Sequence, residues 1–270
     1  MIESLGIIAG SKGLPLVVAR EARAAGVRRL VAVAFENETH PDLALFVDEM
    51  VWLRVGQLSK MISAFKNRGI DRCVMAGQIA PKNLFELRPD LKAMMLLFKL
   101  KEKNARTIFG AIGDELASAG VTLIEATPWL KTVMPSAGFH LGPPLTREQR
   151  ADLAFGYEIA KKVSALEIGQ TVVVKGGTVL AVEGFEGTDA CLARGGQLAG
   201  EKGGAAAVKV ARENHDMRFD IPCIGAQTVC ACLAAKIAVL AIEADKTILL
   251  EREEVERLLR SSKLSITVVP

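Results

Sequence analysis

The sequence predicts an α/β protein, in which an N-terminal Rossmann-like parallel-sheet domain is followed by a C-terminal α/β domain with a mixed sheet. Three observations support this class. Short apolar runs alternate with helical periodicity through the first half, a proline- and glycine-rich segment follows, and a hairpin pattern then interrupts the alternation. We therefore expect the Rossmann-like domain at residues 1–130, a linker at residues 131–146 and the second domain at residues 147–270.

The first half consists of repeated strand–helix units. Strands are expected at residues 5–9, 29–35, 72–76 and 121–126, and helices at residues 16–25, 57–68, 91–103 and 105–119. Such units build parallel sheets, so the loops that follow their strands should meet at one edge of the sheet.

Two glycine-containing loops at that edge are candidates for binding phosphate. Gly10 and Ser11 follow the first strand, and Gly77 and Gln78 follow the strand at residues 72–76. Backbone N–H groups at a helix N-terminus favour phosphate. However, the first loop lacks the glycine spacing of a dinucleotide site and the Gly-Lys-Ser/Thr ending of a P-loop. From spacing alone, a plain turn is the better interpretation of the first loop, whereas a crevice shared by both loops favours a ligand.

The second half combines helices with an antiparallel hairpin. An amphipathic helix is expected at residues 147–166, and two β-branched runs at residues 171–175 and 178–183 are joined by Gly176-Gly177. A Gly-Gly connection supplies the positive φ angles of a tight hairpin turn, which predicts that the two runs pair with each other. A further strand at residues 206–210 leads into a charged segment.

The composition excludes several classes of protein. The formal net charge is only +3 and no basic stripe with aromatics is present, so we expect no nucleic-acid binding. Five cysteines without a leader-like segment indicate reduced thiols in a cytoplasmic protein, with Cys230 and Cys232 buried in an apolar helix. The longest apolar stretch, residues 228–244, contains Lys236 and Glu243 and is too short to span a membrane.

Two polar segments of the second half are candidates for chemistry. The first contains Glu186, Gly187, Thr188 and Asp189, just after the hairpin. Taken alone, Thr188 or Asp189 is best interpreted as the N-cap of a helix, since surface carboxylates beside turns are common.

The second polar segment lies between a strand and a proline turn and mixes both signs of charge. Its candidate site residues are Lys209, Arg212, His215, Arg218 and Asp220. A charge run is usually a solvated loop, but at the end of a buried strand it can place carboxylates on a divalent cation and cations on phosphate oxygens. Pyrophosphate hydrolysis needs that combination, because negative oxygens shield the reacting phosphorus. Oxygen ligands favour Mg²⁺ or Mn²⁺ over zinc.

These motifs resemble those of a known family, the LpxI-type UDP-2,3-diacylglucosamine pyrophosphatases. The resemblance extends over nearly the whole chain. It includes Gly6–Gly10 with Leu14-Pro15, Ala76-Gly77, Ile168-Gly169-Gln170, Ala181-Val182-Glu183 with Glu186–Asp189, and Arg218–Pro222. The resemblance implies Mg²⁺-dependent attack of water on the α-phosphate of UDP-2,3-diacylglucosamine. The products would be UMP and 2,3-diacylglucosamine 1-phosphate, for lipid A synthesis.

The resemblance also implies roles for individual residues. Asp220 and Asp189 would be catalytic and would hold the metal. The substrate would contact Gly10, Ser11, Gly77, Gln78, Glu186, Gly187, Thr188, Lys209, Arg212, His215 and Arg218. The chain departs from the family pattern at Arg212-Glu213 and His215. A hydrolase of another UDP-sugar or nucleotide therefore remains an alternative, as does a nucleotide-sugar-binding regulatory protein without turnover.

The expected ligand, a UDP-linked lipid sugar, suggests peripheral contact with the inner face of the cytoplasmic membrane. The helix at residues 91–103 has methionines and leucines that would suit acyl chains, and lysines that would suit a membrane surface. An ordinary core helix with solvated lysines is nevertheless the better interpretation from sequence. A homodimer is compatible with the sequence, which leaves the oligomeric state open.

Overall fold

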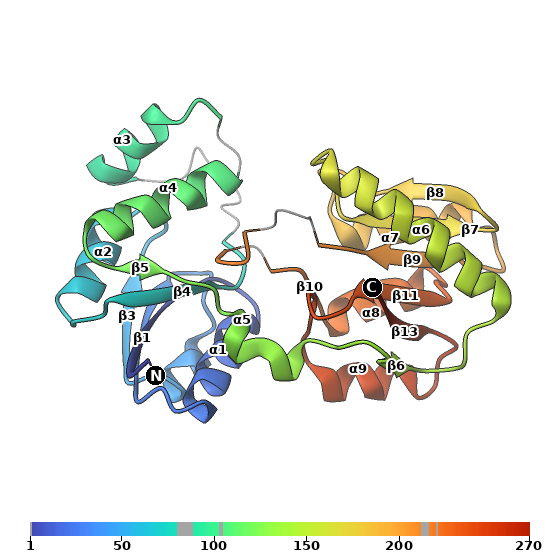
Figure 1. Cartoon of the computed structure of the whole chain (residues 1–270), viewed down its shortest axis with the longest axis horizontal. Helices are drawn as coiled ribbons and strands as arrows, with labels where there is room; N and C mark the ends of the chain where they lie inside the picture. The colour runs from blue at the N-terminus through green and yellow to red at the C-terminus, as the bar shows by residue number, and fades with distance from the viewer. Residues whose placement is uncertain (1, 80–88, 103–104, 212–215, 220) are drawn as a thin grey trace. The chain divides into compact units, whose positions relative to one another are not determined.

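The computed structural model describes residues 2–79, 89–102, 105–211, 216–219 and 221–270. The chain forms two compact units (Figure 1). Unit 1 comprises residues 1–130 together with 216–220, and unit 2 comprises residues 131–215 together with 221–270. Each unit has its own sheet, parallel in the first and mixed in the second, which confirms the predicted fold class.

The sheet of unit 1 has the order β3-β2-β1-β4-β5, and its described strand pairs are all parallel. Its strands are β1 (Ser4–Ala9), β2 (Arg29–Phe35), β3 (Glu49–Leu53), β4 (Arg72–Ala76) and β5 (Thr122–Leu123). This is the order of the first five strands of a Rossmann fold. The sequence did not predict β3, because this edge strand is only partly buried and exposes Trp52.

Helices cover the sheet of unit 1 (Figure 1). They are α1 (Leu14–Ala24), α2 (Leu58–Lys66), α3 (Leu91–Lys99), α4 (Ala105–Ser118) and α5 (Thr127–Leu130), with a short 3₁₀ turn at η1 (Pro41–Leu45). A second 3₁₀ turn, η2 (Lys131–Val133), begins unit 2. Helices α2, α3 and α4 share one apolar core with Val31, Val33 and Phe35 of β2. These three positions alternate along the strand, so one face of β2 meets that core, as the period of two requires.

The sheet of unit 2 has the order β6-β13-β11-β9-β7-β8. Its strands are β6 (His140–Leu141), β7 (Thr171–Lys175), β8 (Thr178–Val182), β9 (Ala206–Lys209), β11 (Val239–Glu243) and β13 (Ser265–Val269). The central strands β9, β11 and β13 are parallel, whereas β6 and the β7–β8 hairpin pair antiparallel. Strand β6 falls within residues 131–146, so the proline- and glycine-rich segment contributes to this sheet.

The predicted hairpin at Gly176-Gly177 is confirmed. Both glycines have positive φ angles, 56° and 71°. The carboxylate of Asp152 accepts the backbone N–H groups of both, at 2.9 and 2.8 Å. A helix residue therefore holds the turn in place.

Helices cover both faces of this second sheet. Helix α6 (Arg147–Ala165) packs on the face that includes Val172 and Val174. Helices α7 (Thr188–Leu198), α8 (Ala226–Ala234) and α9 (Arg252–Leu259) pack on the face that includes Val173. A small parallel pair, β10 (Cys223–Ile224) and β12 (Ile248–Leu249), completes the unit.

One expectation about α8 is wrong. Cys232 is buried there, but Cys230 is exposed. Two residues that are two positions apart lie about 200° apart around a helix, so both cannot share its buried face. Among the described residues, no helix combines the length and the apolar character that crossing a lipid bilayer requires.

Candidate functional site

The two glycine loops of unit 1 meet at the carboxyl edge of its sheet, as predicted. The carbonyl oxygen of Gln78 accepts two hydrogen bonds from Ser11, from the backbone N–H at 2.8 Å and from the side-chain hydroxyl at 2.7 Å. The N–H of Gly10 donates to the carbonyl oxygen of Ala76 at 2.8 Å. The contact is therefore made largely by backbone groups.

Close approach of the two loops explains why glycine occupies both positions. A Cβ atom on Gly10 would lie 2.6 Å from the carbonyl oxygen of Gln78. A Cβ atom on Gly77 would lie 2.5 Å from the carbonyl oxygen of Ser11, and the φ angle there is +85°. Both glycines are thus required by the packing of the loops on each other, whether or not a ligand binds there.

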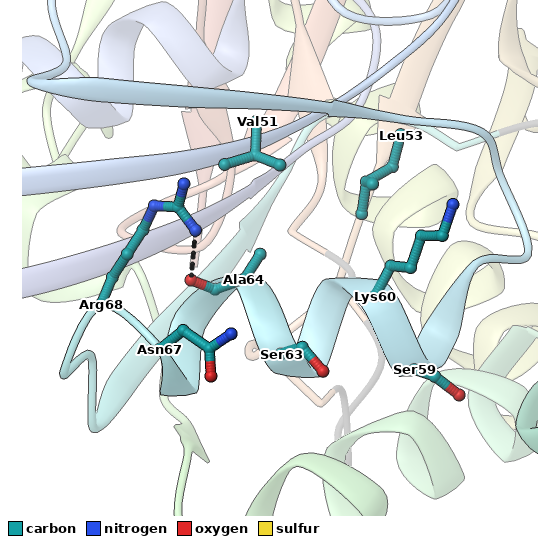
Figure 2. A pocket seen from close by; sticks show the side chains of 8 residues that line it. All are labelled: Val51, Leu53, Ser59, Lys60, Ser63, Ala64, Asn67 and Arg68. Atoms are coloured by element: carbon teal, nitrogen blue, oxygen red, sulfur yellow. Dashed lines mark hydrogen bonds between the residues drawn. The ribbon is translucent and has the colours of Figure 1, made fainter.

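A shallow groove of about 340 Å³ lies elsewhere in unit 1, between β3 and α2 (Figure 2). It is lined by Val51, Leu53, Ser59, Lys60, Ser63, Ala64, Asn67 and Arg68. The guanidinium group of Arg68 donates to Glu49 at 2.8 Å and to the carbonyl oxygen of Ala64 at 3.1 Å. The groove contains no predicted site residue, and the guanidinium group of Arg68 in its lining is already bound to protein groups.

Unit 2 places a row of polar side chains on one face of its sheet. Thr171 of β7 is the register partner of Lys209, the last residue of β9. Glu183 directly follows β8, and its N–H donates to the carbonyl oxygen of Thr171 at 2.8 Å. Thr188, the first residue of α7, lies against this row, and we call these four residues the Thr188 cluster.

The hydroxyl group of Thr188 connects the members of the cluster. Lys209 Nζ donates to Thr188 Oγ1 at 2.9 Å, and Thr188 Oγ1 donates to Glu183 Oε1 at 3.1 Å. Thr171 Oγ1 lies 3.4 Å from the same oxygen. A hydroxyl has one hydrogen and two acceptor positions, so these contacts use all of its capacity. Thr188 therefore links a cation to a carboxylate with a fixed direction of donation.

Two charged members of the cluster are buried. Lys209 is 6% exposed and Glu183 is 7% exposed. Glu183 Oε2 has no hydrogen-bond partner among the described residues. Buried polar atoms in proteins are nearly always satisfied, so this oxygen marks a place for a donor, a water molecule or a cation.

Helix α7 starts beside the cluster without a side-chain cap among the described residues. Its N-cap is Gly187, with a φ angle of 83°, so the interpretation of Thr188 or Asp189 as the N-cap is wrong. Asp189 occupies the first turn, and its carboxylate accepts a hydrogen bond from Gln227 Nε2 at 2.8 Å.

Glu186 holds the loop before α7 together. Its carboxylate accepts the N–H of Gly184 at 3.0 Å and pairs with Arg194. The hydrogen bond from Arg194 lowers the pKa of Glu186 below its ordinary value. Glu186 is therefore ionised and engaged in the loop.

The second predicted segment is described only in part. Arg212, His215 and Asp220 lie outside the described residues. Arg218 donates to both carboxylate oxygens of Asp216, at 2.8 and 2.6 Å, which raises the pKa of Arg218. The ring of Phe219 lies 5.7 Å from that of Phe109, within the core of unit 1.

A second buried ionic cluster was missed by the sequence analysis. Glu243 ends β11 and is fully buried. Its carboxylate accepts the N–H of Ala211 at 2.8 Å and pairs with Lys161 at 3.3 Å, and Lys161 donates to the carbonyl oxygen of Ala211 at 3.0 Å. Lys246 also pairs with Glu243. These bonds fix the backbone where the chain leaves β9. The sequence signal for this cluster is the single acid, Glu243, at the end of an apolar run that forms β11.

No group of three or more His, Cys, Asp or Glu side chains that could hold a metal ion occurs among the described residues. One of the two predicted metal ligands, Asp220, lies outside the described residues. The other predicted metal ligand, Asp189, is described, and its carboxylate is bound to Gln227.

Comparison with known proteins agrees with this architecture. Residues 4–133 match the model of the LpxI N-terminal domain, and residues 136–267 match that of the LpxI C-terminal domain. The chain is 28% identical over 264 residues to the UDP-2,3-diacylglucosamine pyrophosphatase LpxI of Caulobacter vibrioides, covering 94% of this chain and 93% of that protein.

Similarities to solved structures are weak. The biotin carboxylase subunit of pyruvate carboxylase has a TM-score of 0.28 and 16% identity, with 68% of this chain and 36% of the other covered. N5-carboxyaminoimidazole ribonucleotide synthetase from Thermotoga maritima has a TM-score of 0.25 and 12% identity, with 68% and 42% covered. Neither bears on the function. The two domain matches together span nearly the whole sequence, and the chain belongs to the LpxI family.

Proposed function

We propose that this chain hydrolyses UDP-2,3-diacylglucosamine at its pyrophosphate, with Mg²⁺ or Mn²⁺ as cofactor. Water attacks the α-phosphate, and the products are UMP and 2,3-diacylglucosamine 1-phosphate, for lipid A synthesis. The observation that carries the proposal is the similarity to the Caulobacter vibrioides pyrophosphatase over 94% of the chain. Because the substrate carries acyl chains, we place the reaction in the cytoplasm, at the inner face of the membrane.

The Thr188 cluster offers groups that suit a pyrophosphate. The buried ammonium of Lys209 bonds to the first residue of α7, and the N–H groups and dipole at a helix N-terminus favour negative oxygens. In a buried setting, such groups act more strongly than in water on the charge that develops on phosphate oxygens. Thr188 would orient the ammonium of Lys209 toward the substrate.

The cluster also has an oxygen that a hard cation would suit. Glu183 Oε2 is buried without a partner among the described residues, and carboxylate oxygens are ligands that Mg²⁺ prefers. From the family resemblance we propose Asp220 and Asp189 as metal ligands, with Asp220 orienting the attacking water. When bound, the metal ion would neutralise the charge of the phosphate oxygens.

The substrate also has proposed contacts outside the cluster. These are Gly10, Ser11, Gly77 and Gln78 in unit 1, and Gly187, Arg212 and His215. Glu186 and Arg218 were predicted to contact the substrate, but each is bound to a protein partner, Arg194 and Asp216 respectively. We therefore propose that these two residues shape the loops of the site.

A single assay tests the proposal. The full chain is incubated with detergent-dispersed UDP-2,3-diacylglucosamine and Mg²⁺, with and without EDTA, and the release of UMP is followed. We expect release that stops with EDTA and falls by about a hundredfold or more in Asp220→Ala, whereas Asp71→Asn, a control at an exposed acid outside the predicted site, retains most of it. Full activity of Asp220→Ala would contradict the catalytic assignment.

The same assay separates the alternatives. Turnover of other nucleotide sugars alone would support a hydrolase of different specificity, and tight binding without a product would support a regulatory protein. In water enriched in oxygen-18, the label should enter UMP. A label in 2,3-diacylglucosamine 1-phosphate would show that water attacks the other phosphorus.

A further inference from the structure

Helix α3 carries large apolar side chains on two opposite faces. Ala93 and Leu96 are buried in the core of unit 1, and Leu97 packs against that core. In contrast, Leu91, Met94, Met95 and Phe98 are exposed, by 69%, 41%, 52% and 81%. The buried residues explain why α3 packs on unit 1. The exposed apolar residues on the other face do not contribute to the described core.

The exposed residues form one continuous stripe. Their spacing is i, i+3, i+4 and i+7, which at 3.6 residues per turn places all four within an arc of about 100°. They are four of the eleven large apolar side chains that are exposed in the described part of the chain, although α3 has only nine residues. Single exposed apolar residues need no explanation, but a contiguous stripe indicates an interaction surface.

Cations lie along the border of this stripe. By the same helical geometry, Lys92 and Lys99 fall together at about 80–100° from Leu91, at one edge of the arc. Lys92 pairs with Glu115, while Lys99 and the following Lys101 are exposed. The acid at the start of the helix is directed to the backbone, since Asp90 accepts the N–H groups of Ala93 at 2.9 Å and Ser59 at 2.7 Å. The border therefore favours an anionic partner.

We propose that α3 docks this chain on a lipid bilayer that contains anionic phospholipid. Leu91, Met94, Met95 and Phe98 enter the boundary between headgroups and acyl chains, and Lys99 and Lys101 contact the negative headgroups. The flexible side chains of the two methionines can adapt to a fluid partner. The inference rests on the proposed function in one respect, because a diacylated substrate has to be taken from a membrane.

Vesicle sedimentation with the full chain tests the proposal. We expect binding to vesicles of phosphatidylcholine with phosphatidylglycerol, and much weaker binding to phosphatidylcholine alone. Met95→Ser/Phe98→Ser should reduce the binding by about tenfold or more, and Lys99→Gln/Lys101→Gln by about fivefold for each lysine. The control Leu45→Ser/Leu166→Ser removes side chains that are 79% and 71% exposed elsewhere, and should leave binding unchanged. Equal melting temperatures would show that all variants fold.

The outcomes separate this proposal from the function. Absence of vesicle binding, or equal losses in the α3 and control variants, would overturn the docking surface. A dimer in sedimentation velocity that Met95→Ser/Phe98→Ser dissolves would also overturn it, since a second copy would then cover the stripe. If the vesicle results hold but no UMP is released from detergent-dispersed substrate, the docking surface stands and the proposed function fails. The α3 variants should hydrolyse detergent-dispersed substrate at the wild-type rate.

Discussion

The carboxyl edges of the two sheets differ in the groups that form them, which are backbone groups in unit 1 and buried charged side chains in unit 2. In unit 1 the edge is a contact between two glycine loops, held by backbone groups and the hydroxyl of Ser11. In unit 2 the corresponding edge contains buried charge. Every buried charged residue in the described part of the chain lies in unit 2. Glu183, Lys209 and Glu243 lie at this edge, whereas Asp152 holds the hairpin turn at the opposite edge. Burial of charge costs free energy unless partners or ligands offset it. Protein groups offset the charges of Asp152 and Glu243, whereas one oxygen of Glu183 has no partner among the described residues.

The largest expected effect follows from removing one buried charge. Lys209→Met should destabilise unit 2 by about 3–5 kcal/mol, because it removes the buried ammonium that the hydroxyl of Thr188 links to the buried carboxylate of Glu183. Lys12→Met is the matched control in unit 1, where the exposed lysine beside the glycine loop should contribute less than about 0.5 kcal/mol. Urea unfolding measures both.

A double variant distinguishes charge from packing. Lys209→Met/Glu183→Gln should recover much of the loss, since neither buried charge remains. If the double variant is as unstable as Lys209→Met, the cost arises from packing and the comparison between the two edges fails.

The edge of unit 1 should respond to backbone geometry instead. Gly77→Ala forces a Cβ atom to within 2.5 Å of the carbonyl oxygen of Ser11, at a φ angle of +85°. We expect a loss of about 1–3 kcal/mol in the free energy of unfolding. Gly13→Ala is the control, because a Cβ atom there meets nothing within 4 Å and φ is −80°. Equal effects of the two substitutions would show that the loops do not depend on close approach.

The smallest effect concerns the exposed pair of Glu186 and Arg194 in unit 2. The hydrogen bond from Arg194 holds the pKa of Glu186 below its ordinary value of 4.5. The pair therefore contributes stability above that ordinary pKa, and the contribution is lost as the pH falls through the lowered pKa. Arg194→Gln should raise the titration midpoint of Glu186 observed by NMR. An unchanged midpoint would show that the pair does not form in solution.

Much of the fold could be predicted because local patterns determine it. A few neighbouring residues are enough to predict β1, β2 and β4 from their apolar runs, and the hairpin turn from Gly176-Gly177. Strand β3 could not be predicted in the same way, because an edge strand that is half-exposed lacks a continuous apolar run.

The candidate site was less predictable, because it depends on register between distant strands. Thr188 and Lys209 were selected from motifs, but Thr171 looks like any β-branched strand residue. Only the pairing of Thr171 with Lys209, and the position of Glu183 after β8, reveal that these side chains share one face. Gln227, which holds Asp189, comes from yet another element, and its sequence context gives no signal.

The most direct test of the central claim compares two substitutions of Thr188. Thr188→Ser keeps the hydroxyl that joins Lys209 to Glu183, whereas Thr188→Val keeps the side-chain shape and removes that hydroxyl. The measurement is kcat/KM for the release of UMP from UDP-2,3-diacylglucosamine with Mg²⁺. We predict a loss of about a hundredfold in Thr188→Val, with Thr188→Ser close to the wild-type protein. Equal activity of the two variants would contradict the assignment of the Thr188 cluster to the reaction.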